Sequence, residues 1–224
     1  MKKDEFGFIN DILSDTFSIP KDKNNNYWLE EKKQKSQRIF INEKGIGYFK
    51  LYKFDATDDK AMPDPFPFLN SNGDALPKTP NGCRVFCDYF AICTYKGALC
   101  IILFELKTSE KDKAYAKFQL QKGECFAKFI LDIAENIKSK NIPSETDKSN
   151  PTYKGSDYDF VMDYDFLNVK ILKCAIVSSE KNHEGNPTNP KKSKSTTKIK
   201  NDGNNFFTVI FNKMKGELVL TELL

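Results

Sequence analysis

Histidine is almost absent from this chain of 224 residues, since His183 is the only one and it stands in a polar segment. A Ser-His or Cys-His catalytic pair needs an imidazole beside its nucleophile, and the G-x-S-x-G turn is missing as well, which argues against acyl transfer. The chain also lacks the G-x-x-x-x-G-K loop that binds nucleotide phosphates. Any ATP-driven partner would therefore be a separate chain.

The six cysteines lack the C-x-x-C spacing of a zinc knuckle. They stand at positions 83, 87, 93, 100, 125 and 174, and five of them fall in apolar runs. With one histidine to join them, this spacing argues against a zinc site and favours free, buried thiols in a reducing compartment.

Long apolar runs are missing too. No segment approaches the roughly 20 consecutive apolar residues of a membrane span, and the first residues, MKKDEFGFINDIL, lack the apolar core of a secretory signal. The formal net charge of +4 is too small to indicate nucleic-acid binding by itself. We therefore expect a cytoplasmic protein with no membrane partner.

The order of apolar patterns predicts one α/β domain over 1–224, built on a mixed central β-sheet flanked by helices. The expected organisation is an N-terminal helix and hairpin at 1–54, an irregular loop at 55–82, a core at 83–178 and a mobile basic loop at 180–205. The expected elements are a helix at 4–17, a hairpin at 38–54, strands at 85–93, 99–106 and 169–178, a long helix at 111–138, and a closing hairpin made of 206–211 and 217–220. Residues 27–37 read as a turn or short helix.

Three charged residues interrupt the two apolar strands between positions 87 and 107, namely Asp88, Glu105 and Lys107. Glu105 and Lys107 are two residues apart and therefore share a face of their strand. If the strands pair through the turn at 94–98, Asp88 approaches Glu105 near the end of the sheet. Buried carboxylates repel each other, and their oxygen ligands favour Mg²⁺ or Mn²⁺ as the neutralising ion. An adjacent lysine could orient or deprotonate a water, which predicts phosphodiester hydrolysis.

The segments CDYFAI (87–92) and IILFELKT (101–108) resemble the PD-(D/E)XK nuclease superfamily, which has the restriction-endonuclease-like fold. The pattern here is Asp88-x16-Glu105-Leu106-Lys107, with Cys87 in place of the proline. After it, AKFQL at 116–120 is similar to the A-x-x-Q-L element of the helix that follows in the family. The resemblance covers roughly 83–135.

This resemblance implies that Asp88 and Glu105 bind Mg²⁺ or Mn²⁺, with the Leu106 carbonyl as a possible third ligand. It also implies that Lys107 serves the attacking water and that Gln119 supports the site or contacts the substrate backbone. Many members add a glutamate from an early helix. The candidates for that position are Glu5, Glu30, Glu31 and Glu43.

By the same resemblance, the chain would be a metal-dependent DNA endonuclease of bacterial restriction or anti-phage defence, acting as a homodimer or beside an ATPase or sensor subunit. The alternative is a catalytically silent module of the same fold that binds nucleic acid or protein within a larger complex. The sequence leaves DNA and RNA open as substrates.

Further lysines are candidates for contacts with nucleic-acid phosphates, which would make affinity depend strongly on salt. They are Lys122 in the predicted long helix and Lys191, Lys192, Lys194, Lys198 and Lys200 in the basic segment. A solvated loop is the competing interpretation of that segment.

Overall fold

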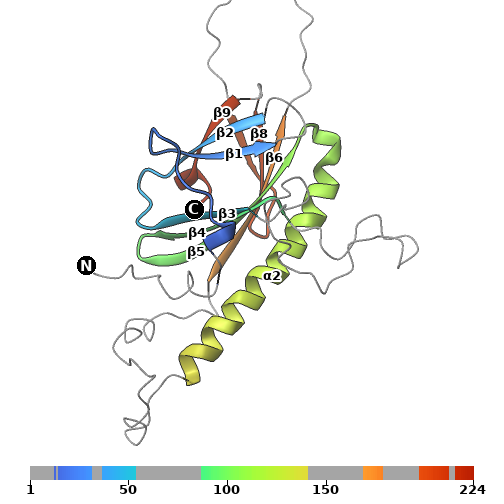
Figure 1. The fold of residues 1–224 in the computed structure, drawn as a ribbon. Coiled ribbons are helices and arrows are strands. Elements are labelled where there is room, and N and C mark those ends of the chain that lie inside the picture. The colour runs from blue at the N-terminus through green and yellow to red at the C-terminus, as the bar shows by residue number, and fades with distance from the viewer. Residues whose placement is uncertain are drawn as a thin grey trace, which may run out of the picture.

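The computed structural model describes Leu13 and residues 15–31, 37–53, 87–140, 169–178, 197–211 and 215–224. These residues form one long helix and two β-sheets, arranged in three layers (Figure 1). The larger sheet is the middle layer, with the helix on one face and the smaller sheet on the other. The predicted α/β class is confirmed.

The larger sheet has six strands in the order β3-β4-β5-β6-β8-β7. The pairs β5–β6 and β6–β8 are parallel, whereas β3–β4, β4–β5 and β7–β8 are antiparallel, so the sheet is mixed, as predicted. The strands are Phe49–Lys53 (β3), Tyr89–Tyr95 (β4), Ala98–Lys107 (β5), Lys170–Ser178 (β6), Thr197–Asn201 (β7) and Phe206–Phe211 (β8).

A two-residue turn joins β4 to β5. Lys96 and Gly97 have φ values of 50° and 79°, and two consecutive positive values define the turn type that best matches the twist of a hairpin. Glycine adopts this conformation without strain. The resulting register sets Asp88 opposite Glu105, one position beyond the first paired residues of the ladder.

The long helix, α2 (Lys113–Lys140), follows β5 through a short 3-10 turn, Glu110–Asp112. It covers one face of the larger sheet and projects beyond it at its C-terminal end (Figure 1). Its buried positions recur at helical spacing and pack against the sheet. These positions are Ala116, Leu120, Ala127, Ile130, Leu131 and Ala134.

A close approach between α2 and the sheet requires glycine at position 123. A Cβ atom at Gly123 would lie 2.6 Å from Cys87 Sγ and 3.3 Å from Leu103 Cδ1. Gly123 therefore lets the helix pack directly over the residue that precedes Asp88, which draws α2 towards this end of the ladder.

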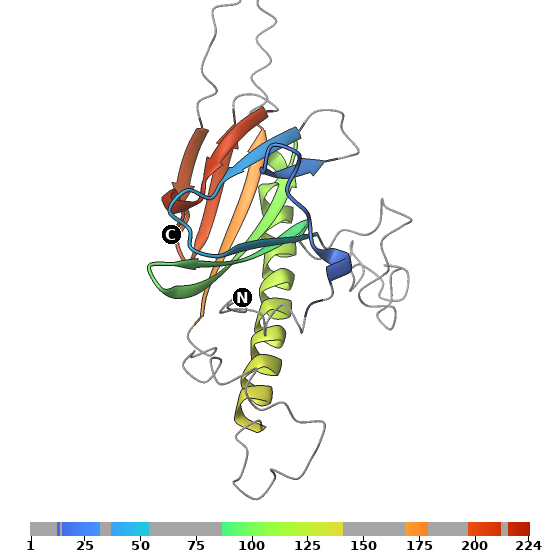
Figure 2. The same cartoon turned by 60° about the vertical axis from the view of Figure 1, so that its left-hand side comes forward.

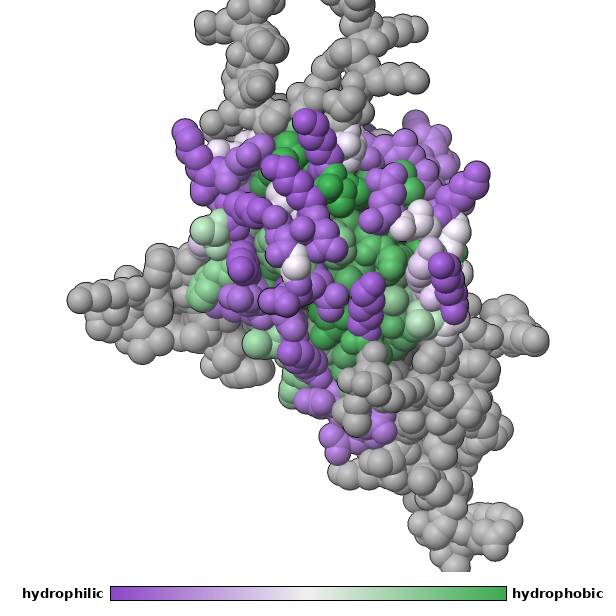
Figure 3. Space-filling view, turned by 180° about the vertical axis from the view of Figure 1, so that it is seen from behind, coloured by the Kyte–Doolittle hydropathy of each residue, from purple (hydrophilic) through white to green (hydrophobic). Residues whose placement is uncertain are grey.

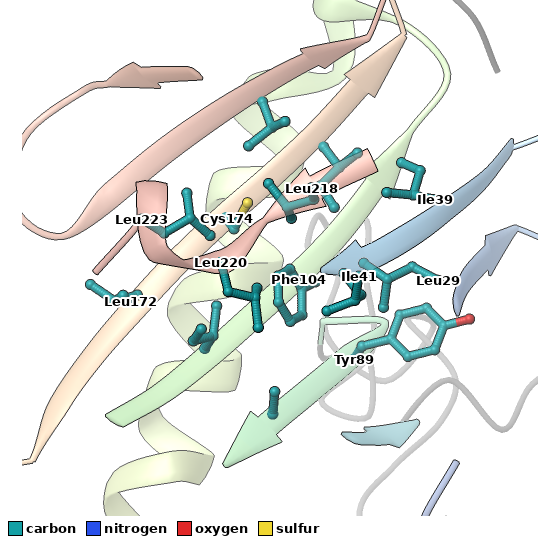
Figure 4. Close-up of a cluster of buried hydrophobic side chains, with 14 of the residues drawn as sticks. Leu29, Ile39, Ile41, Tyr89, Phe104, Leu172, Cys174, Leu218, Leu220 and Leu223 are labelled. Carbon is teal, nitrogen blue, oxygen red and sulfur yellow. The ribbon is translucent and has the colours of Figure 1, made fainter. Parts of the chain in front are cut away.

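The smaller sheet covers the opposite face of the larger one (Figure 2). Its strands are β1 (Tyr27–Glu31), β2 (Gln37–Asn42) and β9 (Lys215–Val219), in the order β1-β2-β9. Leu29, Ile41 and Leu218 point from these strands towards Phe104 of β5 (Figure 4). Both faces of the apolar central strands are covered, as their composition predicts.

The predicted hairpins at the two ends of the chain are wrong. β2 pairs with β1 and β9, whereas β3 pairs with β4, so the segment 38–54 divides between two sheets. Likewise, β8 pairs within the larger sheet and β9 within the smaller one, so these two strands do not form a hairpin. The physical reason is that the second face of the larger sheet must be covered: within the described residues α2 lies on one face only, so strands rather than a second helix cover the other.

Several other expectations differ from the structure or lie outside it. Tyr27–Glu31 is a strand rather than a turn or helix, and Thr197–Asn201 is the edge strand β7 within the segment expected to be a mobile loop. Asp15–Phe17 forms a 3-10 turn at the end of the predicted helix 4–17. The rest of that helix, apart from buried Leu13, and the loop 55–82 lie outside the described residues.

The face turned away from the viewer in Figure 1 carries an apolar area framed by hydrophilic side chains (Figure 3). On α2, Phe118 and Phe129 are the large apolar side chains that stand exposed in the described part of the chain. Within the same residues, no helix combines the length and apolar character needed to cross a bilayer.

Candidate active site

Asp88, Glu105 and Lys107 meet at the end of the β4–β5 ladder. The backbone amide of Asp88 donates a 3.1 Å hydrogen bond to Glu105 Oε2, and Lys107 Nζ donates a hydrogen bond to Glu105 Oε1. Alternation along β5 places Glu105 and Lys107 on the same side as Leu103, which packs in the core beneath α2. The structure thus brings together the three residues that the sequence analysis singled out.

The carboxylate of Asp88 also binds the backbone of β5. The amide of Leu106 donates a 2.7 Å hydrogen bond to Asp88 Oδ2. Because β4 begins at Tyr89, that amide lies just past the end of the ladder and takes a side-chain acceptor in place of a strand partner. The N–H and C=O groups of one strand residue point towards the same neighbouring strand, so the Leu106 carbonyl is also directed towards the segment that contains Asp88. The Leu106 side chain packs on the opposite face.

Glu105 is fully buried, whereas Asp88 and Lys107 are half-buried and give the cluster access to solvent. Burial, and then the charge of Asp88, raise the pKa of Glu105 to about 9, although Lys107 acts in the opposite direction. Burial lowers the pKa of Lys107, but the charge and hydrogen bond of Glu105 outweigh it, so that this pKa lies above its ordinary value. The cluster therefore holds a carboxyl group that is costly to ionise without a further cation.

Tyr115 is a member of this cluster that the sequence analysis missed. Lys107 Nζ lies 4.8 Å from the centroid of the Tyr115 ring, within the range of a cation–π contact. Burial raises the pKa of Tyr115; Lys107 opposes this, and the charges of Glu105 and Asp88 reinforce it. The available signal was its position four residues before Gln119, which places both on one side of the helix.

Gln119 is buried on the side of α2 that faces the sheet, one turn after Tyr115. Lys122 lies elsewhere on the helix, with its ammonium group 4.5 Å from the centroid of the exposed Phe118 ring. The structure thus brings Gln119 to the same end of α2 as the cluster and sets Lys122 beside an exposed aromatic ring. Lys191, Lys192 and Lys194 lie outside the described residues.

The candidate glutamates from the N-terminal part do not join the cluster where the structure describes them. Glu30 on β1 forms a 2.7 Å ion pair with Arg38, and Glu43, after β2, pairs with Lys21. Both belong to the layer on the opposite face of the larger sheet. Glu5 and the side chain of Glu31 lie outside the described residues.

The oxygen atoms of this cluster form a small donor set. Within the described ranges, no group of three or more His, Cys, Asp and Glu side chains gathers as a metal site. A cation here would take the carboxylates of Asp88 and Glu105, the carbonyl of Leu106 and water. Mg²⁺ keeps several waters and often takes only one or two carboxylates, so the residues present fit this ion.

Comparisons with known proteins leave the family open, since no protein-family model, curated protein or solved structure matches the chain. The chemistry and geometry of the cluster itself therefore carry the functional assignment.

Proposed function

We propose that the chain is a Mg²⁺- or Mn²⁺-dependent nuclease of the PD-(D/E)XK superfamily, which hydrolyses phosphodiester bonds of nucleic acid, DNA in particular. The observation that carries the proposal is the convergence of Asp88, Glu105 and Lys107 on one face of the sheet, with Glu105 fully buried. The order of elements supports it. A strand preceded by Asp88, a strand with Glu105 and Lys107, and a helix with Gln119 follow one another as the resemblance implies.

Asp88, Glu105 and the Leu106 carbonyl would hold the metal ion. When bound, the ion would polarise a phosphate oxygen and lower the pKa of a coordinated water. The two carboxylates and the backbone of β5 supply a rigid frame, because Asp88 accepts from the Leu106 amide and donates through its own amide to Glu105. The coordinating oxygens are thus positioned before substrate binds.

Lys107 acts as a positive charge beside the reacting phosphate. Burial lowers the pKa of Lys107, but the charge and hydrogen bond of Glu105 raise it overall in the metal-free protein, so the protonated amine can orient water or stabilise the charge that develops on the phosphate. The Tyr115 ring limits the positions that this ammonium group can take.

The position of the cluster in the fold supports substrate access. Lys107 ends β5 at the edge where the parallel strands β5, β6 and β8 have their carboxyl ends, next to the start of α2. In open α/β sheets, ligands bind outside the carboxyl ends of the strands. A phosphate at this edge meets the side chains of Lys107 and Asp88 from the solvent side.

The test is nicking of supercoiled plasmid by purified protein in Mg²⁺ and in EDTA, with single-stranded DNA and RNA as further substrates. Wild type is expected to nick in Mg²⁺ only, and Lys107→Ala is expected to abolish nicking. Lys44→Ala is the matched control, because Lys44 is an exposed lysine beyond β2. Wild type that leaves every substrate intact in Mg²⁺ and Mn²⁺ would overturn the proposal in favour of the catalytically silent module.

A further inference from the structure

Two lysines on the far edge of the larger sheet stand level with the candidate active site. The strand registers place Lys200 in the same cross-strand row as Glu105, and Lys198 in the same row as Lys107. Each row runs across β5, β6, β8 and β7, and neighbouring strands are about 4.8 Å apart, so the lysines lie on the order of 14 Å from the cluster.

Both lysines are directed to the face that carries the cluster. Ile199 packs with the core under the smaller sheet, and alternation along β7 therefore turns Lys198 and Lys200 to the other face, where α2 lies. Lys198 and Lys200 are exposed, and neither forms an ion pair with any residue that the structure describes.

The first residue of α2 extends this basic surface. Lys113 Nζ lies 2.9 Å from Asp202 Oδ2, in the turn between β7 and β8. Burial raises the pKa of Asp202, but hydrogen bonds from Thr208 and Lys113 and the charges of Lys113 and Lys200 lower it overall. Lys113 and Lys200 thus both act on Asp202, and the ion pair with Asp202 holds the start of α2 against the turn that follows the edge strand.

We propose that Lys198 and Lys200, together with Lys113, bind the phosphate backbone of a nucleic-acid strand whose scissile phosphate lies at the Asp88–Glu105–Lys107 cluster. The inference rests on the proposed function and specifies its substrate as a polymer. At the 3.4 Å rise per nucleotide of a B-form strand, the distance of about 14 Å corresponds to about four nucleotides. Contacts with phosphates carry no sequence information, so this surface binds nucleic acid without sequence preference.

Lysines on an edge strand can also serve to prevent pairing with another sheet. The test must distinguish this role from phosphate binding. The variant is Lys198→Glu/Lys200→Glu, and the control is Lys23→Glu/Lys44→Glu, which changes the charge equally at exposed lysines beside the smaller sheet. Binding of fluorescein-labelled single-stranded and duplex DNA is measured in the Lys107→Ala background, so that cleavage does not interfere.

The edge-strand variant should bind DNA at least about tenfold more weakly than the Lys107→Ala parent. Its plot of log association constant against log salt concentration should be shallower by on the order of 2, whereas the control should change neither quantity. The proposal is overturned if the edge-strand variant and the control have the same affinity and slope. A second readout is cleavage: the edge-strand variant should cut a tetranucleotide as wild type does and long DNA more slowly. If wild type cuts nothing, the proposed function fails, and the binding measurement still decides on the basic surface.

Discussion

The backbone amide of Asp88 donates a hydrogen bond to the carboxyl group of Glu105, across the open end of a β-hairpin. The contact lies at the end of the β4–β5 hairpin, where the register set by the Lys96-Gly97 turn brings the two acidic residues opposite each other. The carboxyl group that it reaches is the fully buried one, so the properties of Glu105 decide how the cluster behaves without metal.

The stability of the metal-free protein should depend on the protonation of Glu105. Its pKa rises from 4.5 to about 9 on folding, so between these values the folded protein holds one more proton than the unfolded chain. The contribution of Glu105 to stability is complete below pH 4.5 and is lost as the pH rises to about 9. Urea unfolding in EDTA should show wild type losing stability over this range.

Glu105→Gln is the matched control for this titration, because glutamine keeps the shape and cannot ionise. The variant should show a flatter dependence of the unfolding free energy on pH than wild type. Equal slopes in the two proteins would show that Glu105 does not hold its proton in the folded state.

The aromatic ring of Tyr115 should matter more than its hydroxyl group. Tyr115→Phe keeps the ring beside Lys107, whereas Tyr115→Leu removes the cation–π contact, which typically contributes about 0.5–2 kcal/mol. The leucine variant should therefore melt at a slightly lower temperature and nick plasmid more slowly, by roughly 2- to 30-fold, while the phenylalanine variant stays near wild type in both measurements. If the two variants have equal rates, the ring does not position the amine.

Gly123→Ala should destabilise the protein although alanine is the better helix former. In an ordinary helix this change adds about 1 kcal/mol of stability. Here the new methyl group would lie 2.6 Å from Cys87 Sγ, and overpacking of this kind costs about 1–3 kcal/mol. Thermal unfolding of Gly123→Ala and of Gly123→Ala/Cys87→Ala tests the contact.

The double variant should regain most of the lost stability, because removal of the thiol makes room for the methyl group. A Gly123→Ala protein more stable than wild type would show that α2 does not approach β4 so closely.

The sequence contained enough local information to locate the cluster. The tight turn, the period of two along β5 and the apolar runs together determined which residues face each other at the hairpin's end. Tyr115 could not be predicted as part of the cluster, because its contact with Lys107 depends on how α2 lies over β5 and an isolated tyrosine in a helix belongs to no motif. The function of each residue in the cluster stays a prediction.

The layers of the fold were harder to predict, because their pairing is not local. β2 and β9 are parallel neighbours although about 175 residues separate their contacting side chains, as in the hydrogen bond between Asn42 and Glu217. The sequence did not predict β7, because Ile199 is its single large apolar residue among lysines and polar neighbours. That pattern is typical of both a loop and an edge strand.

The proposed function requires that Asp88 and Glu105 hold one divalent cation between them, and anomalous diffraction from crystals soaked in Mn²⁺ tests this requirement. We expect one Mn²⁺ about 2.1 Å from a carboxylate oxygen of each residue and from the Leu106 carbonyl, and no peak in Asp88→Asn. A Mn²⁺ ion bound elsewhere, with Asp88 and Glu105 both outside its coordination shell, would show that these two carboxylates do not form the metal site.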